Sequence, residues 1–129
     1  MIHYLNDHDA IAAQIRCYVE GLRTGNSAAA QPAFHGACTF FGYFNGQLLA
    51  GPVQMLFDWV DGNGPVPGVE TRIASIDVHE TIAVVRVEVE KLSGKFGGNP
   101  GGTLSDLFQL IRVDGRWLIS QKSFHWHAA

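Results

Sequence analysis

Hydrophobic positions in the first part of the chain follow a helical period. In residues 7–24 the apolar side chains recur every three or four residues, which places them on one helix face: Ile11, Ile15, Tyr18, Val19 and Leu22. Asp7 or Asp9 is suited to cap the start of this helix, and Gly25 is suited to follow its last turn. The pattern therefore predicts a long amphipathic helix over residues 7–24.

A second helix is expected after Asn26 or Ser27, where a capping residue precedes three alanines. Pro32 lacks a backbone N–H, and its ring strains a helix beyond the first turn. This helix is therefore predicted to be short or kinked before Phe34.

The middle of the chain predicts a β-hairpin followed by a third helix. Residues 38–44 are rich in aromatic side chains, a composition typical of a strand. The Asn-Gly pair at 45–46 tolerates positive φ and favours a tight turn, so residues 47–50 are expected to return as a strand. The Gly-Pro pair at 51–52 suits the first positions of a helix. The apolar face of that helix carries Val53, Leu56, Phe57 and Val60.

The second half of the chain has the alternating pattern of antiparallel strands. Four strands are expected, over residues 70–78, 81–92, 103–113 and 116–126. A glycine-rich connection spans residues 93–102, and an Asp-Gly turn at 114–115 joins the last two strands. Helices followed by a run of strands indicate an α+β layer arrangement.

Composition and charge narrow the classes of function. The 129 residues predict one domain over positions 1–129. A net charge of -3 without a basic stripe argues against a nucleic-acid partner, and no apolar run is long enough for a membrane span. The start of the chain has no signal-peptide pattern. Cys17 and Cys38 lack zinc-site spacing and are interpreted as reduced thiols in a cytoplasmic protein, although a disulfide between them stays an alternative.

Four segments carry a resemblance to a known family: 18–22 (Tyr-Val-Glu-Gly-Leu), 33–35 (Ala-Phe-His), 58–64 (Asp-Trp-Val-Asp-Gly-Asn-Gly) and 113–119 (Val-Asp-Gly-Arg-Trp-Leu-Ile). Through them nearly the whole chain resembles the nuclear transport factor 2-like superfamily, which includes ketosteroid isomerase, scytalone dehydratase and polyketide cyclases. It is most similar to the lumazine-binding and polyketide-cyclase (SnoaL-like) branch. The resemblance implies a strongly curved, antiparallel or mixed sheet around the first helix, a cone-shaped internal pocket, and a homodimer formed through the outer sheet face.

The resemblance also locates candidate acids and bases. Isomerase chemistry needs a carboxylate base, and relatives carry it on the first strand, but residues 40–44 contain no acid. Tyr18 stands where relatives can carry a tyrosine that donates to an oxyanion; alternatively it is a core aromatic residue. Asp106 stands where the family can place a pocket acid, whose pKa an apolar environment would raise; alternatively it caps the preceding loop.

Histidines offer a further set of candidates. His35 is expected to close the second helix, with a pocket-rim position as the alternative. His125 and His127 share one side of a strand and could bind one metal, but no third ligand is specified, so neither metal nor cofactor is expected. His125 could instead reach the pocket. Asp58 is expected to be a solvated surface residue.

Aromatic residues indicate a binding pocket more clearly than the titratable ones. Alternation sends Phe41 and Tyr43 to one face of their strand and Phe40 and Phe44 to the other, so that one pair lines the cavity. The expected pocket residues are Tyr18, His35, Phe41, Tyr43, Phe57, Trp59, Asp106 and His125.

This pattern favours a small-molecule-binding protein. The alternatives are an isomerase, dehydratase or cyclase that uses Asp106 with Tyr18, His35 or His125 for proton transfer, and a structural dimerisation module with a filled interior.

Overall fold

The computed structural model describes residues 4–92 and 102–127. Its elements are, in chain order, α1 (Tyr4–Thr24), α2 (Ser27–Ala30), the 3-10 turn η1 (Gln31–Ala33), β1 (Phe34–Phe44), β2 (Gln47–Pro52), α3 (Gln54–Asn63), β3 (Glu70–His79), β4 (Ile82–Leu92), β5 (Gly102–Val113) and β6 (Arg116–His127). The predicted α+β succession is confirmed. The glycine-rich connection expected at 93–102 lies outside the described residues, except for Gly102, which begins β5.

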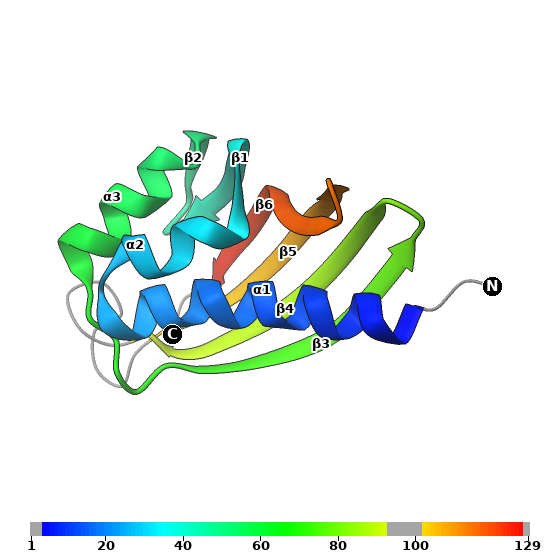
Figure 1. The fold of residues 1–129 in the computed structure, drawn as a ribbon. Helices are drawn as coiled ribbons and strands as arrows, with labels where there is room; N and C mark the ends of the chain where they lie inside the picture. The colour runs from blue at the N-terminus through cyan, green and yellow to red at the C-terminus, as the bar shows by residue number, and fades with distance from the viewer. Residues whose placement is uncertain (1–3, 93–101, 128–129) are drawn as a thin grey trace.

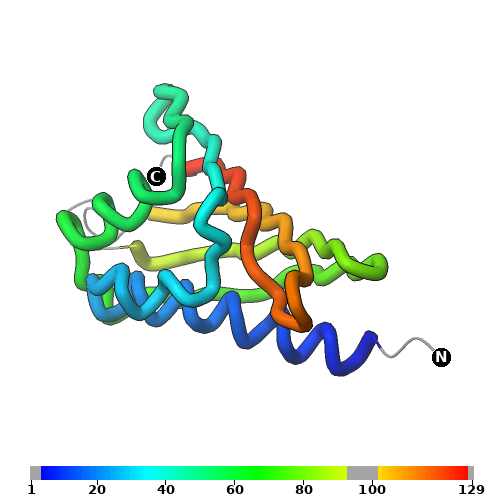
Figure 2. Tube along the Cα trace, turned by 45° about the horizontal axis from the view of Figure 1, so that its top comes forward, coloured from blue at the N-terminus to red at the C-terminus, as the bar shows by residue number. Residues whose placement is uncertain are grey.

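All six strands form one sheet in the order β2-β1-β6-β5-β4-β3. Strands β1 and β6 run parallel, and every other neighbouring pair is antiparallel, so the sheet is mixed. The curved sheet wraps around α1, which runs across its inner face (Figure 1). Helices α2 and α3 lie at one end of α1, beside the β1–β2 hairpin (Figure 2). No helix in the described part of the chain is long and apolar enough to cross a membrane.

Helix α1 buries the apolar face that its sequence predicts. Its buried residues include all five predicted positions: Ile11, Ile15, Tyr18, Val19 and Leu22. The helix begins at Tyr4, three residues earlier than predicted, and Gly25 follows it with a φ of +67°. Asn26 caps α2 by accepting a hydrogen bond from the backbone N–H of Ala28.

The chain between α2 and α3 corrects two predictions. Pro52 ends β2, where it pairs with Thr39, instead of opening α3. Val53 occupies the N-cap position without a side-chain cap, and its backbone N–H donates to Cys38 O at 2.9 Å. Strand β1 begins at Phe34, directly after the 3-10 turn that contains Pro32, so His35 lies in a strand and does not close a helix.

Candidate functional site

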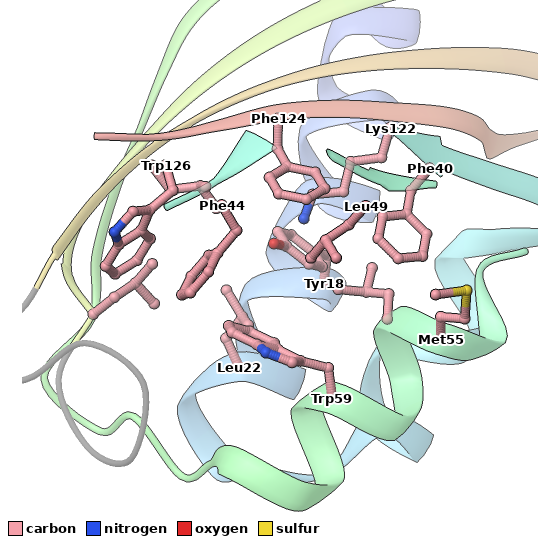
Figure 3. Close-up of a pocket in the computed structure, with 13 residues that line it drawn as sticks. Tyr18, Leu22, Phe40, Phe44, Leu49, Met55, Trp59, Lys122, Phe124 and Trp126 are labelled. Carbon is pink, nitrogen blue, oxygen red and sulfur yellow. The ribbon is translucent and has the colours of Figure 1, made fainter. Parts of the chain in front are cut away.

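A cavity of about 230 Å³ opens between the sheet, α1, α3 and the β1–β2 hairpin (Figure 3). Its lining residues are Tyr18 and Leu22 of α1, Phe40 and Phe44 of β1, Leu49 of β2, Met55, Leu56 and Trp59 of α3, Leu92 of β4, Leu104 of β5, and Lys122, Phe124 and Trp126 of β6. Pockets for drug-sized ligands have roughly 300–1,000 Å³, so this cavity suits a smaller molecule.

Three polar side chains meet at one end of this cavity, which we call the polar end: Tyr18, Asp106 and Lys122. Asp106 is completely buried, and Lys122 is 3% exposed. The Tyr18 hydroxyl donates to Asp106 Oδ2 at 3.4 Å, and Lys122 Nζ lies 3.4 Å from Asp106 Oδ1 as an ion pair. Asp106 Oδ1 accepts no hydrogen bond from the described residues. One buried carboxylate thus joins a phenol and an amine from two other elements.

Aromatic rings enclose the amine of this group. Lys122 Nζ lies 5.2 Å from the ring centroid of Tyr18 and 4.9 Å from that of Phe124, within the range of cation–π attraction. Figure 3 shows the Lys122 nitrogen and the Tyr18 oxygen directed toward each other beneath the Phe124 ring. Among the described lining residues, Lys122 is the only Lys, Arg, His, Asp or Glu.

Burial shifts the proton affinities of the polar end. It raises the pKa of the Asp106 carboxyl above its usual value of 3.8, and the positive charge of Lys122 and the Tyr18 hydrogen bond oppose that shift. The pKa of Tyr18 is raised well above 10, first by burial and then by the negative charge of Asp106. Tyr18 therefore stays protonated near neutral pH and acts as a hydrogen-bond donor.

A β-bulge in β6 brings Lys122 to the inner face. Leu110 pairs with Ile119 and Gln109 pairs with Gln121, so Ser120 is an extra residue without a partner on β5. Odd-numbered residues face inward before this bulge, and even-numbered residues face inward after it. The inward residues are Trp117 and Ile119 on one side of the bulge and Lys122, Phe124 and Trp126 on the other.

Three of the eight predicted pocket residues belong to this region. Tyr18 and Trp59 line the cavity. Asp106 lies behind the lining, in contact with Tyr18 and Lys122, and is completely buried.

The other five predicted residues lie elsewhere, and each is a correction. Phe41 and Tyr43 point to the outer face of β1 and are about half exposed, because the inward positions of this strand are the even-numbered ones. His125 is exposed because the bulge at Ser120 reverses the alternation before it. Phe57 is buried against Phe34 in the core, with ring centroids 5.3 Å apart.

His35 is also displaced from its predicted place. It lies in β1, where its Nδ1 accepts a hydrogen bond from the backbone N–H of Ala37 at 2.9 Å, and it does not line the cavity. The pairing of β1 with β6 is irregular between Phe34 and Thr39, and His35 falls in that interval. Asp58 is exposed as predicted and accepts a hydrogen bond from Gln54.

The two C-terminal histidines lie together on the outer sheet face. The ring centroids of His125 and His127 are 5.1 Å apart, and His127 Nε2 is 2.8 Å from Ser105 Oγ. Within residues 4–92 and 102–127, no group of three or more His, Cys, Asp or Glu side chains is arranged to hold a metal ion.

Lys122 is the ionisable lining residue that the sequence pattern was not used to predict. The signal for it is a change of parity: apolar residues stand at 117 and 119 and then at 124 and 126. An odd interval between two inward positions requires an extra residue in the strand. If the extra residue stands at 120 or 121, the lysine at 122 faces the interior, and the structure places it at Ser120.

Gly42 makes room for one wall of the cavity. It faces inward between Phe40 and Phe44, and a Cβ at this position would overlap both the ring and the backbone oxygen of Phe124. Glycine is therefore required here by the close approach of Phe124, which packs against Phe40 with ring centroids 5.8 Å apart.

Comparison with known proteins identifies the family. Residues 6–125 match the family model described as "Putative lumazine-binding". The chain is 31% identical to "Aldolase FrzH" from Cladobotryum sp. over 121 residues, which cover 93% of this chain and 91% of that protein. The chain therefore belongs to this lumazine-binding-like family of the nuclear transport factor 2-like superfamily.

Two solved structures have the same fold at comparable identity. An NTF2-like protein of unknown function from Shewanella baltica OS155 superposes with a TM-score of 0.88 at 30% identity over the full length of both chains. Another, from Methylobacillus flagellatus KT, gives a TM-score of 0.85 at 36% identity and covers 95% of this chain and 94% of its own. These similarities place the whole described sheet and its helices within the superfamily.

Chemically, the site combines an apolar chamber with a compact proton-transfer group. The ring and aliphatic walls favour a ligand without charge, because burying an uncompensated charge is costly. At the polar end, Tyr18 supplies an O–H donor, and Lys122 Nζ lies 3.4 Å from Asp106 Oδ1. Such groups in a water-poor chamber are suited to polarise a carbonyl or move a proton beside one.

Proposed function

We propose that the protein binds a small, uncharged, mainly apolar molecule in the 230 Å³ cavity, with one polar atom directed at the polar end. The observation that carries this proposal is the combination of an aromatic wall with a single buried polar group. A cavity of this size does not agree with the alternative of a module with a filled interior. The binding role rests on shape and chemistry, since the fold alone serves many functions.

Tryptophan fluorescence tests this binding role directly. Of the three tryptophans, Trp59 and Trp126 line the cavity, whereas Trp117 lies outside it and donates to Asp7 Oδ1 at 3.2 Å. Titration with small aromatic ketones should change the emission saturably, and the change should be lost in the variant W59F/W126F. The matched control W117F should keep it. A wild-type protein that shows no saturable change with a panel of such ketones contradicts the proposal.

A second candidate function is catalysis of proton transfer beside a carbonyl. It is favoured by the contact of Tyr18 and Lys122 with the buried Asp106, and by the relative named as an aldolase, since aldol reactions and double-bond isomerisations both begin with such a transfer. Asp106 would act with Tyr18 and Lys122, since neither His35 nor His125 lines the cavity. Exchange of the ketone's α-hydrogen for deuterium, followed by NMR, tests this candidate with D106N as the inactive variant.

We also propose a homodimer formed through the outer face of the sheet. Exposed apolar side chains on the outer face form an outer patch in two parts, Phe41, Tyr43 and Leu48 on β1 and β2 and Val84 and Leu107 on β4 and β5, on the two sides of β6. Several large apolar side chains exposed on one sheet face favour a protein interface there. The two cysteines are unpaired, which supports a location in the reducing cytoplasm.

A further inference from the structure

We propose that Lys122 binds its ligand covalently, as an imine between Nζ and the carbonyl carbon of a small aldehyde or ketone. This inference rests on the proposed binding function of the same cavity and specifies the class of ligand. It starts from the position of Lys122, which is the only ionisable nitrogen among the described lining residues.

The surroundings of Lys122 suit an amine nucleophile better than an anion receptor. Its side chain is 4% exposed, and Asp106 already compensates its charge at 3.4 Å. An anionic ligand would find no second cation among the described lining residues and would add a buried negative charge beside Asp106. A carbonyl compound is neutral and adds no charge to the chamber. A lysine amine that is removed from water in an apolar pocket is a better nucleophile than an exposed one.

Asp106 provides the place for the proton that must leave Lys122. A proton moves from Nζ to Asp106 Oδ1, which has no other hydrogen-bond donor among the described residues. This transfer converts an ion pair into a neutral amine and a neutral carboxylic acid, which a low-dielectric chamber favours. The free electron pair of Nζ then faces the cavity.

The covalent step is balanced by the groups present. The Nζ electron pair forms a bond to the carbonyl carbon, and the C=O π pair moves to oxygen, which takes a proton from Asp106 or Tyr18. The nitrogen of this adduct carries two protons and a positive charge, and it returns one proton to the acid that has just donated, which leaves a neutral carbinolamine. The same acid then protonates the hydroxyl group, which leaves as water while the nitrogen electron pair forms C=N. The last N–H proton of the resulting iminium returns to that acid, which is thereby regenerated. One carbonyl and one amine give one imine and one water, with no change of oxidation state.

Tyr18 has a separate part in these transfers. Its hydroxyl donates to Asp106 Oδ2, whereas Lys122 lies near Oδ1, the other oxygen of the same carboxylate. It can therefore hold the carboxylate in place while Oδ1 exchanges protons with Nζ. We infer that Y18F slows imine formation without abolishing it.

Reductive trapping tests the proposal on the complete wild-type chain. The protein is incubated with benzaldehyde or acetophenone, treated with sodium borohydride, and examined by intact mass and peptide mapping. We expect one alkyl group per chain, located on Lys122. The chain has three lysines, and Lys91, which is exposed and paired with Glu70 at 2.7 Å, serves as an internal control that should stay unmodified.

Two variants extend the test. K122R keeps a positive charge but cannot form an imine, so its trapped product should be lost while circular dichroism shows a folded chain. Y18F should form the product more slowly, on the order of 100-fold for the loss of one acid–base group. Equal labelling of wild type and K122R, or labelling of Lys91 in preference to Lys122, would overturn the proposal.

The outcomes separate this inference from the binding function on which it rests. A saturable change in tryptophan fluorescence without a trapped product leaves the binding proposal standing and refutes the imine. Neither binding nor trapping with the whole panel of aromatic aldehydes and ketones contradicts both.

Discussion

Lys122 Nζ lies 3.4 Å from Asp106 Oδ1, and both side chains are almost completely excluded from solvent. The two residues come from neighbouring strands, and Tyr18 of α1 contacts the same carboxylate. Buried ion pairs contribute little net stability, because the loss of hydration offsets the attraction. A buried pair beside an apolar cavity therefore supports the proposed function of the cavity more than it supports a role in folding.

The first prediction concerns the cost of breaking this pair. D106L or K122M alone should lower the free energy of unfolding by about 3–5 kcal/mol, because each leaves one buried group without its partner. The double variant D106L/K122M should recover most of that loss, since it removes both charges and keeps apolar volume. Urea unfolding of the four proteins measures the coupling. Losses that simply add in the double variant would contradict a direct interaction.

The second prediction is a pH dependence that belongs to Asp106. Burial raises the pKa of this carboxyl in the folded chain above the value of 3.8 expected when the chain is unfolded. As the pH rises, the unfolded state loses this proton first, so the carboxyl's contribution to stability is complete below 3.8 and is lost as the pH passes the folded pKa. D106N lacks the ionisable carboxyl group, so this pH-dependent contribution to its stability is absent.

Unfolding of wild type and D106N at a series of pH values measures this effect. The stability of wild type relative to D106N should be greatest in acid and should fall with rising pH. In K122M the fall should extend to higher pH, because Lys122 is the main group that lowers the pKa of Asp106. A stability difference between wild type and D106N that does not vary with pH would show that Asp106 titrates as an ordinary carboxyl.

The third prediction concerns the glycine beneath Phe124. G42A places a Cβ against the ring and the backbone oxygen of Phe124, so β1 and β6 must separate locally. Overpacking of this kind costs about 1–3 kcal/mol. It should also displace Phe124 from the cavity wall and weaken ligand binding.

G36A is the matched control for this variant. Gly36 lies in the same strand, and a Cβ there meets no atom within 4 Å. Its stability should stay within about 0.5 kcal/mol of wild type. Equal behaviour of G42A and G36A in urea unfolding would contradict the packing described for Phe124.

Most of the fold was predictable from hydrophobic period and turn residues. The apolar face of α1, the Asn45-Gly46 and Asp114-Gly115 turns, and the alternation in β4 each depend on local sequence, and each prediction is confirmed. Asp106 was singled out through the family resemblance, which places a pocket acid at this point of the strand. These features need no knowledge of how distant segments pair.

The rest depended on strand pairing, which local pattern does not determine. The choice between Phe41 and Phe40 as cavity residues requires knowing which face of β1 meets α1. Because Ser120 has no partner on β5, Lys122 faces the cavity and His125 faces outward. A one-residue shift reverses every later side chain of a strand, so one unrecognised bulge was enough to place the wrong residue in the cavity.

The fourth prediction concerns the reactivity of the two thiols. Burial raises the pKa of Cys38 to about 11, although the positive charge of Lys122 opposes the shift. Because the thiolate is the reacting form, iodoacetamide should modify Cys38 of the folded protein far more slowly than a free thiol at about pH 8. Cys17 is partly exposed and should react first. Mass spectrometry follows both sites, and modification of Cys38 at the rate of a free thiol would contradict its burial.

The last prediction is that the outer patch forms a homodimer. In the sheet register, Tyr43 lies between Leu48 of β2 and His125 of β6. Leu107 of β5 pairs with Ser123, two residues before His125 in β6. Tyr43 and Leu107 are 50% and 49% exposed in the single chain, so a charge at either position is harmless to the monomer and costly once a second copy covers it. Wild type should scatter light as twice the 14.1 kDa chain at micromolar concentration. Y43E and L107E should dissociate, since loss of a central contact costs about 2 kcal/mol or more. L5E introduces the same charge on α1, where Leu5 is 81% exposed, and should stay dimeric. A wild-type monomer, or dissociation of L5E together with the patch variants, would show that the outer face is not the interface.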